Sequence, residues 1–283
     1  MKIYIIIPAF NEEAHIGQML ESLASQTVLP TKAAIVDDNS TDKTFDIANS
    51  YAKYHDWLSV VQHESSNEHI PGSKVINAFN RGKDSLDKEF DVICKFDADI
   101  ILPNNYLEEL ITLFESDSNI GIAGGLLFIQ KNNEWVYESI ASKEHVRGPI
   151  KAYRKQCIQD IEGLKDSIGW DTADVLLAQF HGWLVRTNKN LHVKHMKPTG
   201  KTYTAKSKYL QGEALYKLRY GFSLTLLTAL KSGFNKRSIR YCLNTISGYL
   251  KAKNEKTEPF VSLSEGQFIR QLRWRGVKKS LGL

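Results

Sequence analysis

The sequence has few cysteines and no long apolar run. Its three cysteines, Cys94, Cys157 and Cys242, are widely spaced and form no Cys-x-x-Cys pair. This usage excludes a cysteine metal site and suits a reducing compartment. The longest apolar run near the end, residues 220–230, is too short to cross a bilayer. Because an apolar segment already begins at Ile3, we expect no signal peptide. The sequence therefore predicts a cytoplasmic protein that is not an integral membrane protein.

Glycine is missing from residues 8–11, Pro-Ala-Phe-Asn, which follow the first apolar segment. A dinucleotide-binding dehydrogenase would need Gly-x-Gly-x-x-Gly there, and the lysine motif of a phosphate-binding loop is absent as well. The remaining composition is ordinary for a globular protein, with 283 residues of which 42% are hydrophobic and 24% charged. This length suits one domain with an extension.

The first 115 residues alternate short apolar segments with stretches of helical periodicity. Four such alternations favour an α/β fold, in which a parallel sheet carries helices on both faces. A further alternating segment, residues 191–198, predicts a late strand. The expected strands of the first part are residues 3–7, 33–36, 58–61 and 92–96, and the expected helices are residues 14–23, 43–54, 74–85 and 104–115.

Acidic and amide side chains follow the expected strands. Residues 37–42 read Asp-Asp-Asn-Ser-Thr-Asp, and Asp97 and Asp99 come directly after the buried strand 92–96. Open parallel sheets bind ligands beyond the carboxyl ends of their strands. Because Asp97 and Asp99 are two residues apart, both carboxylates are expected on one side, where they suit Mg²⁺ or Mn²⁺ bridging a diphosphate. The position after a buried strand carries this inference, since an Asp-x-Asp triplet alone is common.

Three segments in this order resemble the family 2 glycosyltransferases. They are Ile-Pro-Ala-Phe-Asn-Glu at residues 7–12, Val-Asp-Asp-Asn-Ser-Thr-Asp at residues 36–42, and Asp-Ala-Asp at residues 97–99. The resemblance covers most of residues 1–200. It implies the GT-A fold, which has a mostly parallel central sheet, and an inverting transfer from a nucleotide sugar, with a UDP-sugar favoured.

The resemblance also implies a division into domains. Residues 1–200 are expected to form the GT-A catalytic domain, with residues 1–115 as its nucleotide-binding half and residues 116–200 as its acceptor half. Residues 201–283 are expected to form a helical, basic C-terminal extension.

The resemblance assigns roles to individual side chains. Asp99 is expected to bind the divalent cation directly, Asp97 to hold the ribose or sugar side of the donor, and Asp38 to accept a hydrogen bond from the base. Asp42 is expected to cap or begin the next helix, and Asp37 to fix its loop. The remaining donor-binding residues are expected to be Pro8, Ala9, Glu12 and Lys74, although a solvated Lys74 is equally compatible with the sequence.

An inverting transfer needs a general base opposite the leaving group. The family usually has a Glu-Asp pair where this chain has Trp170-Asp171, so the match is partial and Asp171 is the expected base. Asp171 could also serve as a helix N-cap, and Asp174 is the second candidate for the base.

His195 lies near the end of the expected late strand, before the Pro-Thr-Gly turn at residues 198–200. Some relatives complete the metal site with a histidine in this region, which makes His195 a candidate ligand, although a lone histidine is more often structural. Upstream, Gly148 and Pro149 resemble a loop between donor and acceptor pockets and suggest close approach of the backbone to a sugar.

Charge is distributed unevenly along the chain. Residues 187–283 have a net charge of +16 and residues 1–186 a net charge of −11, which together give the overall +5. Within residues 260–283, apolar and basic residues alternate at helical spacing around Trp274. Such a helix either docks on the inner face of an anionic membrane or packs on the catalytic lobe by its apolar stripe, and the sequence leaves both open. Nucleic acid is not an expected partner, because no recognition module is present.

The favoured function is transfer of a single sugar to a glycan or lipid-linked precursor. Polymerising relatives have several membrane helices and a Gln-x-x-Arg-Trp motif, and this chain has neither. A nucleotidyltransferase is one alternative, but it would need a basic, glycine-rich loop where residues 8–13 are acidic. A catalytically degenerate, nucleotide-binding scaffold is the other alternative, and the presence of Asp97, Asp99 and Asp171 disfavours it.

Overall fold

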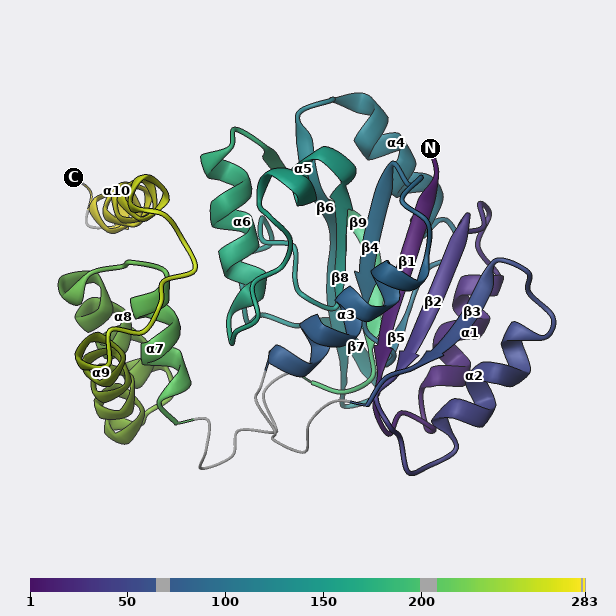
Figure 1. The fold of residues 1–283 in the computed structure, drawn as a ribbon, viewed down its shortest axis with the longest axis horizontal. Coiled ribbons are helices and arrows are strands. Elements are labelled where there is room, and N and C mark those ends of the chain that lie inside the picture. The colour runs from purple at the N-terminus through teal and green to yellow at the C-terminus, as the bar shows by residue number, and fades with distance from the viewer. Residues whose placement is uncertain (65–71, 199–207, 281, 283) are drawn as a thin grey trace. The chain divides into compact units, whose positions relative to one another are not determined.

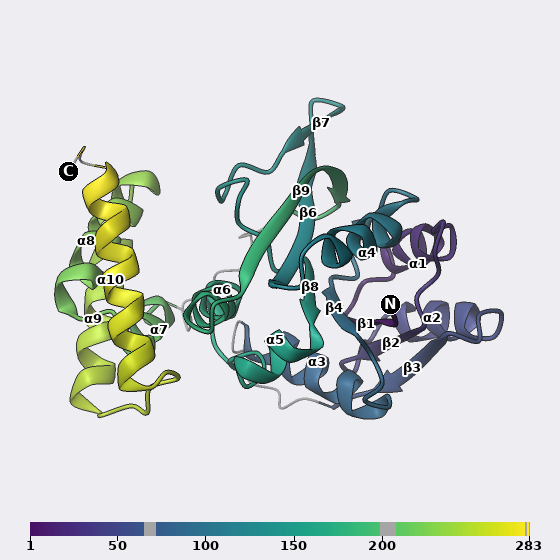
Figure 2. The same ribbon diagram turned by 90° about the horizontal axis from the view of Figure 1, so that it is seen from above.

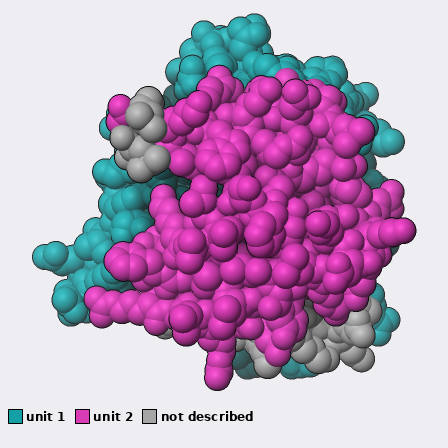
Figure 3. Space-filling model, turned by 90° about the vertical axis from the view of Figure 1, so that its left-hand side faces the viewer, with its two compact units in different colours: residues 1–69, 74–164, 181–199 teal, residues 70–73, 165–180, 200–283 magenta. Residues whose placement is uncertain are grey.

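The computed structural model describes residues 1–64, 72–198, 208–280 and 282. The chain forms two compact units, coloured separately in Figure 3. Unit 1 comprises residues 1–69, 74–164 and 181–199, and unit 2 comprises residues 70–73, 165–180 and 200–283.

Unit 1 is built on one twisted sheet with the strand order β3-β2-β1-β4-β8-β6-β9-β5, and β7 pairs with β6 beside this path (Figure 1). Its strands are β1 (Ile3–Ala9), β2 (Lys32–Asp37), β3 (Leu58–Gln62), β4 (Val92–Phe96), β5 (Ile100–Ile101), β6 (Ile120–Lys131), β7 (Glu134–Tyr137), β8 (Ile150–Arg154) and β9 (Leu184–His195). Its helices are α1 (Ile16–Ala24), α2 (Thr44–Ala52), α3 (Ser73–Ser85), α4 (Tyr106–Ser116) and α5 (Lys155–Asp160).

The four expected strand–helix alternations are present, which confirms the α/β fold. Strands β1, β2, β3 and β4 are parallel to one another, and the long pair β6–β9 is also parallel. Strand β8 runs antiparallel between β4 and β6, and the short strands β5 and β7 are antiparallel additions.

Helices cover both faces of the sheet because its central strands are apolar on both sides. In β1, Ile5 and Ile7 belong to the core that contains the buried residues of α1, α2 and α4. Ile6 points to the opposite face, where α3 approaches so closely that a Cβ on Gly82 would lie 2.6 Å from Ile6 Cγ2. A strand with both faces buried is expected to be almost wholly apolar, as β1 is. Figure 2 gives a second view of these layers.

Unit 2 contains five described helices: α6 (Trp170–Phe180), α7 (Leu210–Lys217), α8 (Phe222–Asn235), α9 (Ile239–Asn254) and α10 (Leu263–Ser280). Helix α6 therefore belongs to the second compact unit, whereas we expected it in the acceptor half, residues 116–200. The expected boundary at residue 200 lies outside the described residues, and the functional domain limits stay a prediction.

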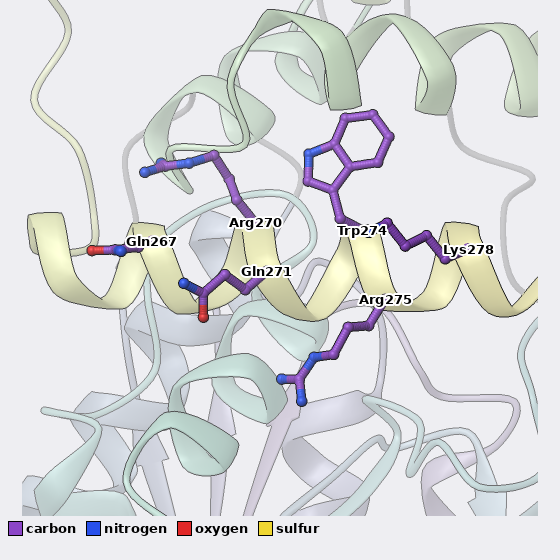
Figure 4. A pocket seen from close by; sticks show the side chains of 6 residues that line it. All are labelled: Gln267, Arg270, Gln271, Trp274, Arg275 and Lys278. Atoms are coloured by element: carbon purple, nitrogen blue, oxygen red, sulfur yellow. The ribbon is translucent and has the colours of Figure 1, made fainter. Parts of the chain in front are cut away.

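Helix α10 confirms the helix expected near the end of the chain. Its apolar stripe is partly covered inside unit 2, because Ile269 is buried and the ring of Phe268 packs edge-on against Phe180 of α6 at 5.6 Å. Figure 4 shows Arg270 and Trp274 on one side of α10 and Arg275 on the other, among the side chains that line a hollow along this helix. Part of the apolar stripe is thus covered within unit 2 while Trp274 stays exposed, and whether α10 meets a membrane or the catalytic lobe stays a prediction.

A search of the described ranges for helices long and apolar enough to cross a bilayer finds none.

We predict that Gly82→Ala destabilises the protein. The added methyl group would also lie 2.7 Å from Val36 Cγ2, and both neighbours are branched side chains, Ile6 in the buried strand β1 and Val36 in the buried strand β2. Overpacking of this kind costs about 1–3 kcal/mol, which exceeds the gain in helix propensity. Urea denaturation measures the difference. The matched control is Gly17→Ala in α1, where the nearest atom is Ile47 Cγ2 at 3.9 Å, so that the free energy of unfolding rises by up to about 1 kcal/mol. Equal changes in the two variants would contradict this account of the α3 packing.

Candidate functional site

Two carboxylates and one imidazole meet where β4 ends and β5 begins. Asp97 follows β4, Asp99 precedes β5, and β5 pairs antiparallel with β9 so that Ile100 lies opposite His195. The amide of Met196 donates to the backbone oxygen of Asp99 at 2.9 Å, which extends this pairing. One ligand atom from each of Asp97, Asp99 and His195 lies within 4.8 Å of the others. The fold therefore brings together three of the residues selected from the sequence.

A buried acidic residue that the sequence did not single out orients His195. Glu138 follows β7, and its Oε2 lies 3.0 Å from His195 Nδ1 and accepts a hydrogen bond from Arg147 Nη1 at 3.1 Å. An ionised Glu138 places the imidazole proton on Nδ1, which leaves Nε2 facing Asp99 Oδ2 at 3.7 Å. Glu138 belongs to no sequence motif, because its partners lie 9 and 57 residues away in the chain.

Negative charge is concentrated at this point. Burial raises the pKa of Asp99 to about 6, and the neighbouring charge of Asp97 adds to the effect. Burial alone would lower the pKa of His195, but its hydrogen bond to Glu138 and the charge of Asp99 outweigh burial and raise it. Two hard oxygen donors and an imidazole nitrogen suit Mg²⁺ or Mn²⁺, and a carboxylate behind the histidine is the usual arrangement of a metal-binding imidazole. The residues present therefore fit a divalent cation.

A buried lysine forms an ion pair with Asp97 and orients its carboxylate. Lys95, in β4, forms an ion pair with Asp97 and donates to the carbonyl of Gly148 at 3.4 Å. Its cross-strand partner in β8 is Lys151, which is also fully buried. The ion pair fixes one oxygen of Asp97, and the contact with Gly148 joins the loop before β8 to the same site.

The loops after β1 and β2 are locked together by side chains. Asn11 has a φ of 53°, and its side-chain Oδ1 accepts a hydrogen bond from the backbone amide of Thr41 at 2.8 Å. The backbone amide of Asn11 donates to Ser40 Oγ at 2.9 Å. Asparagine tolerates this left-handed conformation better than most residues. The amide of Asp38 donates to the carbonyl of Ala9 at 2.9 Å, so that the two strand ends lie side by side.

These loops present the residues expected to bind a nucleotide. Ala9, Asp37 and Asp38 are buried and Pro8 is half-buried. Asp37 Oδ2 accepts from the amide of Ser40 at 3.3 Å, whereas its buried Oδ1 has no hydrogen-bond partner among the described residues. A buried carboxylate oxygen without a donor is costly, and a bound ligand could supply one.

Three further candidates have defined contacts. Glu12 forms an ion pair of 2.5 Å with Lys197, two residues beyond His195, so that the end of β9 is tied to the loop after β1. The Lys74 ammonium lies 6.0 Å from the ring centroid of Phe10. Asp42 accepts hydrogen bonds from the amides of Thr44 at 2.9 Å and Glu13 at 3.1 Å. It lies one residue before the cap position of α2, which is Lys43, so the expected role of Asp42 as a cap or first-turn acid is wrong.

Asp171 lies in unit 2, in the first turn of α6. The helix begins at Trp170 after Gly169, whose φ is 77°, so Asp171 is a first-turn acid and the N-cap alternative is wrong. Asp174 is buried, and its Oδ1 lies 2.6 Å from the amide of Val175.

Solved structures of two other proteins have a fold similar to that of this chain. The chain aligns with the structure of Staphylococcus aureus TarS 1-349 in complex with UDP-GlcNAc at a TM-score of 0.56 and 19% identity, covering 81% of this chain and 66% of that one. It aligns with the mannosyltransferase PcManGT from Pyrobaculum calidifontis in complex with GDP-Man and Mn²⁺ at a TM-score of 0.57 and 13% identity, covering 98% and 80%. These likenesses confirm the expected GT-A fold.

Comparison with curated proteins gives partial matches. The chain is 34% identical over 100 residues to the probable glycosyltransferase YdaM of Bacillus subtilis, which covers 35% of this chain and 23% of that protein. It is 42% identical over 64 residues to the poly(ribitol-phosphate) β-glucosyltransferase of Bacillus spizizenii, which covers 22% and 10%. The matched segments thus span less than a quarter of either relative.

The family model described as Glycosyl transferase family 2 matches residues 4–163, a segment that contains all three motifs selected from the sequence. Since this match covers more than half of the 283 residues, the chain belongs to glycosyl transferase family 2.

Proposed function

We propose that this chain is a metal-dependent, inverting glycosyltransferase that moves one sugar from a nucleotide sugar to a hydroxyl group of a glycan or lipid-linked glycan precursor. The observation that carries the proposal is the cluster of Asp97, Asp99 and His195 at the carboxyl end of β4. The similarity to the poly(ribitol-phosphate) β-glucosyltransferase supports a polymeric acceptor with hydroxyl groups. The UDP-GlcNAc in the TarS complex supports a UDP-sugar as the donor.

The cluster provides the residues that would hold the cation. Asp99 and His195 are proposed as direct ligands of Mg²⁺ or Mn²⁺, with Asp97 beside them toward the ribose or sugar of the donor. A cation at this place would act as a Lewis acid toward the diphosphate leaving group. Glu138 holds the His195 ring so that Nε2 faces the cluster, and Lys95 holds Asp97.

The loops after β1 and β2 are proposed to bind the nucleotide. Asp38 is proposed to accept a hydrogen bond from the base, and the unpaired Oδ1 of Asp37 offers a second acceptor. Pro8 and Ala9 are proposed to contact the nucleotide beside these acceptors. Glu12 and Lys74 are proposed to complete it, near the phosphates or the base.

Asp171 is proposed as the general base. In an inverting transfer the acceptor hydroxyl attacks the anomeric carbon from the face opposite the diphosphate, and its proton must pass to a carboxylate. Asp171, in the first turn of α6, is the carboxylate proposed to accept it.

The most direct functional test is release of nucleotide from a panel of UDP- and GDP-sugars, with Mn²⁺ and with chelator, by the wild type and by Asp99→Asn. We predict metal-dependent release by the wild type and none by the variant. The amide keeps the volume of the carboxylate and removes a buried charge, so the fold is retained. Mn²⁺ affinity falls because an anionic oxygen ligand becomes a neutral one. Calorimetry measures that affinity. Asp46→Asn, an exposed change in α2, is the matched control. Equal release with chelator would contradict the proposed chemistry.

Glu138→Gln should weaken the cation site without removing a ligand. The variant keeps an acceptor for His195 Nδ1 but loses the charge that increases the basicity of the ring, and changes of this kind reduce metal affinity roughly 10–100-fold. Calorimetric titration with Mn²⁺ gives the affinity, and the ¹⁵N shifts of the imidazole report its tautomer. Glu144→Gln, at an exposed ion pair with Lys189, is the control and should behave as wild type. An unchanged affinity in Glu138→Gln would remove Glu138 from the site.

Asp171→Asn should separate donor binding from chemistry. We expect the donor affinity and Mn²⁺ affinity to be unchanged, and kcat to fall by the roughly 10²–10⁴-fold that loss of a general base produces. Steady-state kinetics on the variant and on Asp174→Asn make the comparison. If Asp174→Asn lost kcat and Asp171→Asn did not, the base would be Asp174.

A further inference from the structure

The hairpin of α8 and α9 exposes large apolar side chains near its tip. Phe234 is 85% exposed and Ile239 is 81% exposed, and Leu230 and Leu243 are exposed beside them. Leu230, Phe234 and Ile239 line one hollow, so they form a continuous surface and not scattered residues. We call these four residues the hairpin patch.

Near the tip of the hairpin, small residues lie between the two helices while the large apolar side chains of the hairpin patch stay exposed. The buried positions there are Ala229 and Gly233 in α8 and Cys242 in α9. A Cβ on Gly233 would lie 2.9 Å from Cys242 Cβ, so the close approach of α8 and α9 requires glycine there. Small residues between helices with large apolar residues outside are typical of helices that meet lipid, and a helix packed only in a water-soluble core shows the reverse.

The charges around the hairpin patch are all of one sign. No Asp or Glu occurs between Glu213 and Glu255, a stretch that contains eight Lys and Arg residues. Lys231, Arg237 and Arg240 are exposed at the tip, on the same turns as the hairpin patch. Apolar side chains bordered by basic ones match the acyl chains and phosphates of an anionic lipid surface. Two copies of the patch would instead bring like charges together, which disfavours self-association.

We propose that the hairpin patch docks this protein on an anionic bilayer, with Phe234 and Ile239 inserted at the level of the acyl chains and Lys231, Arg237 and Arg240 near the lipid phosphates. The contact lies on the surface, since no described helix can cross a bilayer. The proposal places membrane contact at the α8–α9 tip and not on the apolar stripe of α10, part of which is covered within unit 2. It does not depend on the proposed transferase activity.

Co-sedimentation of the full chain with vesicles tests the proposal, using phosphatidylcholine alone and phosphatidylcholine with 30 mol% phosphatidylglycerol as roughly physiological surface charge. We expect binding to the anionic vesicles only. Phe234→Ser with Ile239→Ser should lower the vesicle affinity at least roughly tenfold, because both side chains leave the acyl region. Replacing Lys231, Arg237 and Arg240 by Gln should lower it by about 100-fold, about fivefold for each charge. The fold is retained in each case, because every changed side chain is exposed.

Three controls make the result decisive. Tyr54→Ser, on an 84% exposed side chain of unit 1, should bind vesicles as the wild type does. Gln replacements at Arg275, Lys278 and Lys279 of α10 should lower vesicle affinity less than the replacements at the hairpin tip, and the opposite ranking would overturn the proposal.

Light scattering without lipid examines self-association. A concentration-dependent dimer that Phe234→Ser with Ile239→Ser abolishes would make the hairpin patch a subunit interface and overturn the proposal. Absence of anionic vesicle binding by the full chain would also refute the proposal, whatever the outcome of the nucleotide-release assay.

Discussion

The short antiparallel pairing between β5 and β9 determines where the candidate site can form. Ile100 and Ile101 of β5 pair with His195 and Lys194 of β9, and this short antiparallel contact places Asp99 beside a histidine that is 96 residues distant in sequence. Strand β9 is fixed in turn by its long parallel pairing with β6. Because β5 continues from the loop after β4, the carboxylates of Asp97 and Asp99 and the imidazole of His195 are aligned by the same sheet that forms the core.

This arrangement requires buried charge, and the surrounding residues show how the fold tolerates it. Arg147 neutralises Glu138, Glu138 orients His195, and Lys95 pairs with Asp97. Burial is the main reason why the pKa of Asp99 is raised. The negative charges of Asp97 and Glu12 raise it further. Buried ionic groups of this kind rarely add to stability, and in the proposed function they are retained because they hold donor atoms in position for a cation.

Much of the fold could be predicted because the signals are local. The β1 and β4 segments are nearly continuous apolar runs, and the polar motifs after β1, β2 and β4 stand where parallel strands end. Asp97 and Asp99 were therefore visible from the sequence. His195 was a candidate because its segment alternates like a strand and because some relatives have a histidine ligand in this region. The pairing that brings it to Asp99 depends on register over 96 residues and has no local signal. Glu138 carried no signal, since a buried carboxylate after a short strand has no distinctive spacing.

The C-terminal helices were harder to interpret for a physical reason. An apolar residue at helical spacing predicts burial, but it does not say which partner covers it. Phe268 and Ile269 are covered by the protein, whereas Phe234 and Ile239 remain exposed, although all four occur in similar apolar and basic surroundings. The assignment of α6 to unit 2 likewise depends on tertiary contacts that periodicity does not contain.

Anomalous diffraction at the manganese edge, from crystals grown with Mn²⁺ and UDP, tests the central claim most directly. The account predicts one anomalous peak at about 2.0–2.3 Å from a carboxylate oxygen of Asp99 and from His195 Nε2, with the diphosphate completing its coordination. A peak elsewhere, or bound UDP with no peak between Asp99 and His195, would contradict it.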